Sequence, residues 1–170
     1  MAQTRSSANT SVNSVKLPSA FTHFTPYGHI MDYGCGKFYN NTKKYCDEYC
    51  LSYHPFDVFN CPNSENEKTI AFGENHGFNK IYCCNVLNVI DDVETIMNII
   101  KRMYTYLVIT GTIYIQIYEG DKTGVGRETK YDCYQRNAKT VDYIDIVRDA
   151  LKGCDYYWYK ECNFIVITKM

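Results

Sequence analysis

Hydrophobic and polar residues follow two different periods along this chain, and together they predict helices and strands in alternation. From Asp91 to Tyr106, apolar residues fall three or four positions apart, as on the buried face of an amphipathic helix. The same spacing predicts a helix over 140–151, ended by Gly153, and local signals predict helices over 16–24 and 40–49. Runs rich in apolar, β-branched and aromatic residues predict strands at 29–32, 51–53, 69–72, 80–85, 112–118, 156–160 and 164–168.

This order of elements predicts the fold class. Strands that alternate with helices favour a Rossmann-like, doubly wound α/β fold with a mostly parallel seven-stranded sheet, to which the last two strands add a C-terminal antiparallel hairpin. We expect loops at 58–67 and 119–133, a turn at 73–79, and an end of the second strand at His54-Pro55. With 170 residues, one domain is expected over 16–170, preceded by a flexible, Ser-, Asn- and Thr-rich arm at 1–15.

Charge and cysteine content narrow the class of protein. The 18 basic and 19 acidic side chains give a net charge of -1, so the overall charge does not support a nucleic-acid partner, although local basic patches stay open as an alternative. Nine cysteines at irregular spacings, with no signal peptide, predict reduced thiols, a cytoplasmic location and no metal site. No apolar run approaches the roughly 20 residues that cross a bilayer, so no membrane partner is expected. Abundant tyrosine and asparagine are typical of an AT-rich genome and favour a phage or low-GC bacterial source.

The segment after the first predicted strand carries the most informative motif. Asp32 ends an apolar run and is followed by Gly34 and Gly36, one residue apart. A glycine turns the chain tightly and lets backbone N–H groups approach a ligand that a larger side chain would exclude. The helix predicted from residue 40 then presents its amino end to the same place. The pattern predicts a nucleotide-type site at this turn, in which Asp32 supports the loop or a polar group of the ligand.

Other predicted strands also end in polar or small residues. These ends are Tyr53–Asp57, Glu74–Asn75 and Asn85–Asn88. In an open α/β sheet the ligand lies beyond the carboxyl ends of the strands, where the strand order reverses. His54 follows Gly34 at the separation where such folds place a group that binds ribose hydroxyls. A nucleoside-bearing cofactor fits this layout.

Three sequence blocks, in this order, resemble those of class I S-adenosylmethionine-dependent methyltransferases. The blocks are Asp32-Tyr33-Gly34-Cys35-Gly36-Lys37, Tyr53-His54-Pro55-Phe56 and Cys84-Asn85-Val86-Leu87-Asn88-Val89-Ile90. The resemblance covers about residues 28–170. The chain is similar in particular to small phage and bacterial enzymes, including those associated with DNA phosphorothioation, and a late block, Tyr134-Gln135-Arg136-Asn137, resembles a Gln-containing block of that group.

The resemblance implies a role for each block in binding S-adenosylmethionine, or its product S-adenosylhomocysteine. The residues implied to surround the amino-acid part of the cofactor are Asp32, Tyr33, Gly34, Cys35 and Gly36. The ribose would be held by Tyr53, His54, Pro55 and Phe56. The residues implied to contact the adenine and flank the methyl group follow the third and fourth strands and are Asn75, Asn85 and Val86.

Two positions depart from the family's pattern. His54 stands where the family usually has a ribose-binding carboxylate, and Phe38 stands at the third glycine position of G-x-G-x-G. A carboxylate accepts two hydrogen bonds from a cis-diol, whereas a neutral imidazole offers one acceptor and one donor. The nearby carboxylate of Asp57 is an alternative ribose ligand.

The candidate catalytic residues are Asn85, Tyr134 and Gln135. Methyl transfer needs mainly alignment of the acceptor, plus a base where the acceptor carries a proton, so no enzyme nucleophile is expected. The predicted function is transfer of a methyl group to an unidentified small molecule or an exposed group of a macromolecule. The chain lacks the Asp-Pro-Pro-Tyr and Pro-Cys motifs of DNA amino and cytosine C5 methyltransferases. Two alternatives stay open: a catalytically impaired module that binds the cofactor or a protein, and a phage nucleic-acid modification or counter-defence factor.

Overall fold

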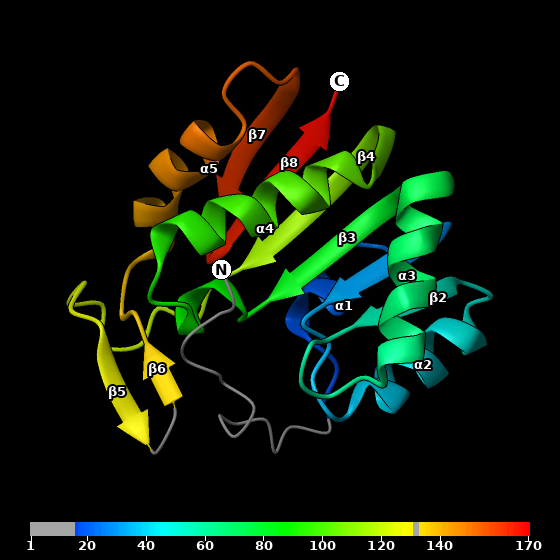
Figure 1. Cartoon of the computed structure of the whole chain (residues 1–170), viewed down its shortest axis with the longest axis horizontal. Helices are drawn as coiled ribbons and strands as arrows, with labels where there is room; N and C mark the ends of the chain where they lie inside the picture. The colour runs from blue at the N-terminus through cyan, green and yellow to red at the C-terminus, as the bar shows by residue number, and fades with distance from the viewer. Residues whose placement is uncertain (1–15, 131–132) are drawn as a thin grey trace.

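A six-stranded sheet in the order β2-β1-β3-β4-β8-β7 forms the centre of the molecule (Figure 1). The computed structural model describes residues 16–130 and 133–170, so the arm predicted for 1–15 lies outside the described residues. The strands are β1 (His29–Tyr33), β2 (Ser52–Phe56), β3 (Phe78–Cys84), β4 (Leu107–Gln116), β7 (Tyr156–Glu161) and β8 (Phe164–Lys169). The first four are parallel, and β8 pairs antiparallel with β4 and β7, which confirms the predicted C-terminal hairpin.

Helices cover both faces of this sheet (Figure 1). One face carries α3 (Asn63–Asn75), α4 (Val93–Thr105) and α5 (Ile144–Ala150), and the other carries α1 (Ser19–His23) and α2 (Tyr39–Glu48). Single-turn 3-10 helices, η1 (Leu87–Val89) and η2 (Thr140–Tyr143), precede α4 and α5. None of the helices in the described ranges is long and apolar enough to cross a bilayer.

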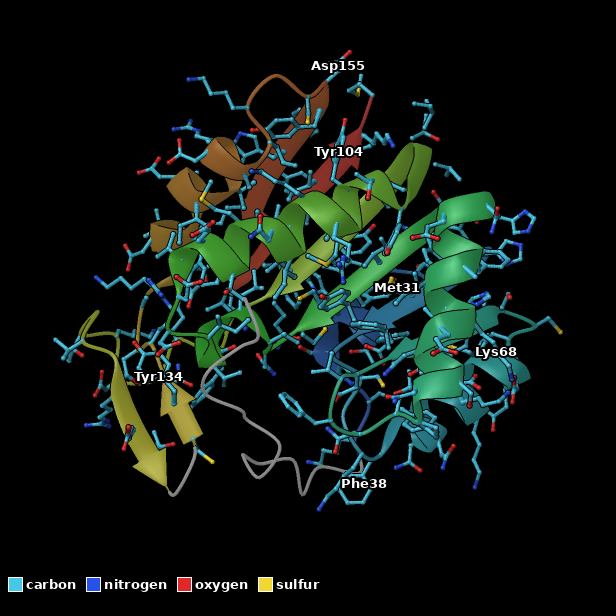
Figure 2. The ribbon with its side chains drawn as sticks, viewed as in Figure 1. Met31, Phe38, Lys68, Tyr104, Tyr134 and Asp155 are labelled. Atoms are coloured by element: carbon cyan, nitrogen blue, oxygen red, sulfur yellow. The ribbon has the colours of Figure 1, made fainter. Side chains whose placement is uncertain are left out.

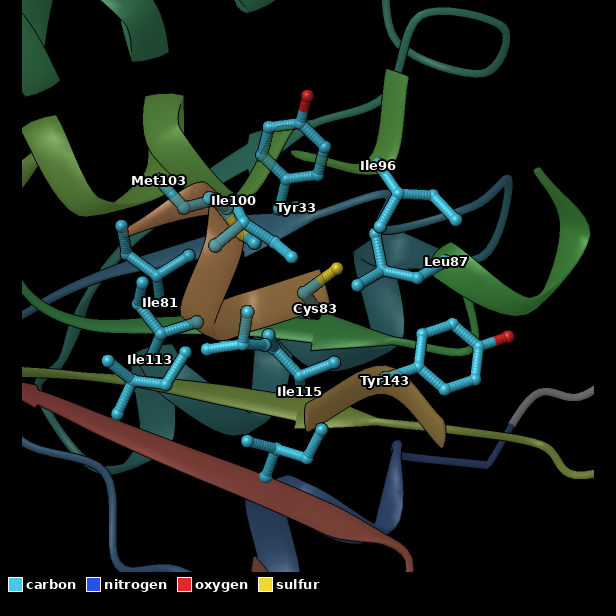
Figure 3. Close-up of a cluster of buried hydrophobic side chains, with 14 of the residues drawn as sticks. Tyr33, Ile81, Cys83, Leu87, Ile96, Ile100, Met103, Ile113, Ile115 and Tyr143 are labelled. Carbon is cyan, nitrogen blue, oxygen red and sulfur yellow. The ribbon is translucent and has the colours of Figure 1, made fainter. Parts of the chain in front are cut away.

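The larger core lies between α4, α5 and the sheet (Figure 3). The helix predicted for 91–106 is confirmed as α4, whose buried residues Ile96, Ile100 and Met103 recur every three or four positions and pack over Ile81 and Ile113. The carboxylate of Asp92 caps this helix, since it accepts a hydrogen bond of 2.8 Å from the N–H of Thr95. The core therefore fixes β3 and β4, the two central strands of the sheet.

The strand order creates a crevice at the end of the sheet where the parallel strands terminate. From β1 the chain passes through α2 to β2 on one side, and from β2 it crosses through α3 to β3 on the other side of β1. The two chain connections therefore run to opposite sides of β1, and the strand order reverses between β1 and β3. In open α/β sheets this is the point at which ligands bind, beyond the carboxyl ends of the strands.

The structure has six strands in its main sheet, not seven, because the strand predicted for 69–72 is wrong. These residues lie in α3, which also replaces the loop predicted for 58–67 from residue 63 onward and the first three residues of the turn predicted for 73–79. The buried residues of α3 are Asn66, Thr69 and Gly73, which carry no large apolar side chain and so conceal the helical period. These residues instead let α3 pack closely against neighbouring segments. The Thr69 hydroxyl donates to the Pro55 carbonyl at 2.7 Å. A Cβ on Gly73 would lie 2.9 Å from the Tyr106 ring.

Two further boundaries differ from the sequence-based expectation. His54-Pro55 does not end β2, which continues to Phe56. Pro55 is tolerated because β2 is an edge strand, where one side of the ladder needs no N–H donor. Within the predicted loop 119–133, β5 (Arg127–Lys130) pairs with β6 (Cys133–Gln135) as a separate two-stranded sheet (Figure 1).

Candidate functional site

A cavity of about 670 Å³ opens beyond the carboxyl ends of β1, β2 and β3. Its lining comes from the turn after β1, the segments after β2 and β3, the end of β4, and the hairpin β5–β6. Residues Lys16–Ser19, at the start of α1, complete it. Small-molecule sites in proteins have volumes of about 300–1,000 Å³, so this crevice has room for a cofactor-sized ligand.

The turn after β1 is shaped by two glycines in the left-handed region. Gly34 has φ of 77° and Gly36 has φ of 70°. A Cβ on Gly34 would lie 2.2 Å from Cγ2 of Val86, whereas a Cβ on Gly36 would meet nothing within 4 Å. The N–H groups of Gly34 and Cys35 both donate to the Phe56 carbonyl, at 2.7 and 3.2 Å. Gly34 therefore permits close packing against the β3 end, and Gly36 leaves the backbone open beside the cavity.

Asp57, directly after β2, holds this turn in place. Its Oδ2 accepts a hydrogen bond of 2.9 Å from the Gly36 N–H, and its Oδ1 accepts from the N–H groups of Phe59 and Asn60 and from the Asn60 side chain. The side-chain amide of Asn66 in α3 fixes the Asp57 backbone: its Oδ1 accepts from the Asp57 N–H and its Nδ2 donates to the Asp57 carbonyl, each at 3.0 Å. The carboxylate is buried and lines the cavity, and Oδ2 can accept a second hydrogen bond.

Asp32 is a buried carboxyl group in the cavity wall. It accepts a hydrogen bond of 2.7 Å from the Tyr53 hydroxyl. Burial raises the pKa of Asp32 to about 7; the Tyr53 hydrogen bond opposes this shift and the charge of Asp57 adds to it. The group is therefore poised between its neutral and ionised forms near neutral pH, and a cationic ligand group would favour the ionised form.

The end of β3 forms the next part of the wall. Asn85 has φ of 59°, and its N–H donates to the Gln116 carbonyl at 2.9 Å, which ties the ends of β3 and β4 together. Its exposed side chain lines the cavity. Val86 lies against Gly34, so the glycine turn and the β3 end are packed as one unit.

The hairpin β5–β6 closes the far side of the cavity. Figure 2 shows Tyr134 on this hairpin and Phe38 after the glycine turn, both on the lower side of the view, where the central strands end. The Asn88 amide donates to Oε1 of Gln135 at 3.1 Å, and the Gln135 amide donates to the Tyr118 carbonyl at 3.0 Å. These side-chain amides connect the hairpin to η1 and to the segment after β4.

The structure brings together most of the site residues expected from the sequence. Those that line the cavity are Asp32, Tyr33, Gly34, Cys35, Gly36, Phe56, Asn85, Val86, Tyr134 and Gln135. Tyr53 reaches the site only through its hydrogen bond to Asp32. His54, Pro55 and Asn75 are not part of the lining.

His54 and Asn75 lie elsewhere for reasons that the fold explains. The His54 ring lies 4.2 Å from the Phe72 ring and 5.2 Å from the Phe78 ring, centre to centre, and its Nε2 is 3.0 Å from the Ser52 hydroxyl. Burial lowers the pKa of His54 to about 4, which keeps the ring neutral near pH 7. Asn75 ends a helix that leads into the amino end of β3, so it lies at the opposite edge of the sheet from the strand ends.

Several lining residues were not among the site residues predicted from the sequence. Val58 and Phe59, both exposed apolar side chains, follow Asp57 directly, and Asn88 lies in η1. The signal for the first two was an acidic residue followed by apolar ones at a loop start, which became informative only once the true end of β2 was known. Lys16–Ser19 belong to the segment 16–24, which the sequence predicted as a helical lid that shapes the substrate pocket, although none of its residues was named as a site residue.

Solved structures of methyltransferases share this fold. A methyltransferase dependent on S-adenosylmethionine from Methanosarcina mazei matches with a TM-score of 0.59 at 11% identity, over 91% of this chain and 98% of that chain. CalS10, an amino pentose methyltransferase from Micromonospora echinaspora solved with S-adenosylmethionine, matches with a TM-score of 0.57 at 9% identity, over 89% and 87%. The 1,6-didemethyltoxoflavin-N1-methyltransferase of Burkholderia thailandensis, solved with S-adenosylhomocysteine, gives 0.57 at 17% identity, over 88% and 73%.

These likenesses define the fold as the Rossmann-like α/β methyltransferase fold, with a mostly parallel sheet and a C-terminal antiparallel hairpin. They do so at low sequence identity: no family model and no curated protein sequence matches the chain.

Proposed function

We propose that this protein is an S-adenosylmethionine-dependent methyltransferase whose acceptor is a small molecule. The observation that carries the proposal is the joint position of the glycine turn and the Asp57 carboxylate at the point where the strand order reverses. The shared fold supports it, because neighbours with this fold were solved with S-adenosylmethionine or S-adenosylhomocysteine bound.

The cavity offers a matching group for each part of the cofactor. The turn at Gly34–Gly36, with Asp32 beneath it, would take the amino-acid part, since a cationic ammonium favours the ionised Asp32. The free acceptor capacity of Asp57 Oδ2 suits a ribose hydroxyl, in the role that the sequence had suggested for His54. The exposed Val58 and Phe59 would cover the adenine ring, which has an apolar face that stacks on aromatic side chains.

The methyl group would then face the other wall, where Asn85, Tyr134 and Gln135 are the proposed catalytic and acceptor-aligning residues. The cofactor supplies a methyl group on a positively charged sulfur. The chain's own contribution is to align the acceptor and to exclude water, through the hairpin β5–β6 and Lys16–Ser19. No covalent intermediate on the enzyme is needed.

A small-molecule acceptor is favoured because the site is covered by short segments of the same domain. The neighbours include enzymes described as methyltransferases of an amino pentose and of 1,6-didemethyltoxoflavin. The finer predictions, a relation to phage and bacterial enzymes associated with DNA phosphorothioation and a cytoplasmic location, rest on sequence blocks and composition alone.

Calorimetric titration with S-adenosylmethionine and S-adenosylhomocysteine tests the proposal. We expect micromolar binding of both, followed by transfer of a labelled methyl group to one member of a panel of sugars, amines and heteroaromatic compounds. No binding of either ligand would contradict the proposal. Binding without transfer to any acceptor, small or macromolecular, would favour the catalytically impaired module instead.

A further inference from the structure

Two thiols meet beside the glycine turn. The Sγ atoms of Cys35 and Cys61 are 3.4 Å apart, and neither cysteine is in a disulfide. Cys35 lies between Gly34 and Gly36 and lines the cavity. Cys61, two residues ahead of α3, is 8% exposed.

The backbone holds these two thiols together. Asp57 accepts from the Gly36 N–H through its side chain, at 2.9 Å, and from the Cys61 N–H through its carbonyl, at 3.1 Å. The same residue therefore anchors the segment on each side of the thiol pair. Because both hydrogen bonds are donated by main-chain N–H groups, they fix the two backbone segments that carry the cysteines relative to each other.

The two thiols differ in reactivity. The hydrogen bond between them lowers the pKa of Cys61 and raises that of Cys35, which is also desolvated. A thiolate, not a thiol, is the nucleophile toward oxidants. This difference favours Cys61 as the attacking group and Cys35 as the resolving group.

We propose that Cys35 and Cys61 form a paired-thiol site that a peroxide converts into an intramolecular disulfide, and that this link closes the cavity to the cofactor. The Cys61 thiolate attacks one peroxide oxygen, and the other oxygen leaves as water after taking up a proton. This gives a sulfenic acid at Cys61. The Cys35 sulfur then attacks the Cys61 sulfur, and the Cys35 proton leaves with the hydroxyl as a second water. In total, two thiols are oxidised and one peroxide is reduced.

In this proposal, disulfide formation moves the glycine turn. A disulfide has an S–S length of about 2.05 Å, so the two sulfurs must approach by more than 1 Å. Gly34 and Gly36 flank Cys35, and the space beside Gly36 is empty, so the turn can follow its sulfur. A displacement of the turn by about 1 Å would change its contacts with the cofactor, and misplacements of this size can cost about 100-fold in the rate of an enzyme reaction. This second part of the proposal rests on the proposed function.

The first test is independent of any cofactor. The full chain, with the exposed Cys50, Cys154 and Cys162 changed to serine to suppress intermolecular links, is treated with one equivalent of hydrogen peroxide and then alkylated. Peptide mass mapping is expected to find Cys35 linked to Cys61 as the main product. A mixture of links, or over-oxidation without a link, would overturn the paired-thiol site.

The second test measures S-adenosylhomocysteine affinity by calorimetry before oxidation, after it, and after re-reduction with dithiothreitol. We expect affinity to fall at least tenfold on oxidation and to return on reduction, and S-adenosylhomocysteine to slow formation of the link. Cys61→Ser in the same background is expected to bind as the reduced protein does and to be insensitive to peroxide. Unchanged affinity of the linked protein would overturn the closure. Absence of binding by the reduced protein would instead contradict the proposed function and leave the mapped link standing.

Discussion

The two walls of the cavity are built in different ways. At the ends of β1 and β2, backbone N–H groups of the glycine turn donate to the Phe56 carbonyl and to the buried Asp57 carboxylate. At the hairpin β5–β6, side-chain amides make the connections, from Asn88 through Gln135 to the Tyr118 carbonyl. Within the described residues, this second wall also contains two buried amide oxygens without a hydrogen-bond partner, Asn88 Oδ1 and Gln116 Oε1.

This difference matches the two tasks of a transferase. A wall fixed by main-chain geometry is suited to one invariant ligand, because its groups are positioned by the fold itself. A wall built from loop side chains can be altered by a few substitutions without unfolding the sheet. We therefore expect the cofactor to depend on the first wall and the choice of acceptor to depend on the second.

Gly34→Ala is expected to break the first wall most severely. The new Cβ would clash with Val86, a stiff β-branched residue, in a backbone conformation that costs an L-residue about 1–2 kcal/mol. Affinity for S-adenosylhomocysteine should fall by about 100-fold or more in calorimetry. Gly124→Ala is the matched control, because Gly124 has φ of 75° but nothing within 4 Å of a Cβ. It should lose stability without losing affinity, and equal affinity losses in both variants would contradict the account.

Asp57→Ala and His54→Ala separate the two candidate ribose positions. Loss of the Asp57 carboxylate leaves the N–H groups of Gly36, Phe59 and Asn60 without their acceptor, at a cost of about 1–3 kcal/mol for a buried donor, and removes the proposed ribose ligand. S-adenosylhomocysteine affinity should fall by about 10- to 100-fold. His54→Ala should lower the melting temperature, because His54 packs on Phe72 and Phe78, but leave affinity unchanged. The reverse pattern would restore the original prediction for His54.

Cofactor affinity should rise with pH through the range in which Asp32 ionises. With a folded pKa of about 7, Asp32 is mostly neutral at pH 6 and mostly ionised at pH 8, so affinity for cationic S-adenosylmethionine should increase by about tenfold between them. Asp32→Asn should remove this dependence and bind weakly at both values. A pH-independent affinity in the wild type would contradict the role of Asp32.

The same group makes a prediction for folding stability. Its folded pKa is raised above the ordinary value of 3.8, so its contribution to stability is present below about pH 4 and is lost as pH rises to about 7. Asp32→Asn should therefore gain stability relative to wild type at pH 8 but not at pH 4, as measured by urea denaturation. Comparing the two proteins at each pH removes the opposite effect of His54, whose lowered pKa weakens the fold as pH falls from about 6.5 to about 4.

Gln135→Ala tests the second wall and should have the smallest effect on the cofactor. It removes the bridge between Asn88 and the Tyr118 carbonyl, so the free energy of unfolding should fall by about 1–2 kcal/mol. Affinity for S-adenosylhomocysteine should stay within about twofold, because the first wall is intact. An affinity loss as large as that of Asp57→Ala would show that both walls hold the cofactor.

The sequence predicted those elements whose burial depends on large apolar side chains. α4 and β8 have such residues at the period of their structure, and both were recognised. α3 was missed because its buried face is Asn66, Thr69 and Gly73, a pattern that makes sense only against the β2 end and Tyr106. Local sequence patterns do not reveal these contacts, because the contacts join segments that are separated in the chain.

The same distinction applies to the site. The glycine turn is local, so its residues were identified together, and the structure brings them to one cavity. The assignment of His54 depended on where β2 ends, and that depended on whether Pro55 lies at a sheet edge, which is a property of the whole topology. Extending β2 to Phe56 makes Asp57 the first residue beyond the strand and leaves His54 inside it.

A crystal structure of the protein with S-adenosylhomocysteine tests the central claim most directly. The account predicts the amino-acid part of the ligand at Gly34–Gly36, a ribose hydroxyl within hydrogen-bond distance of Asp57 Oδ2, and the adenine against Val58 or Phe59. Ribose bound to His54, or ligand bound outside this cavity, would contradict it.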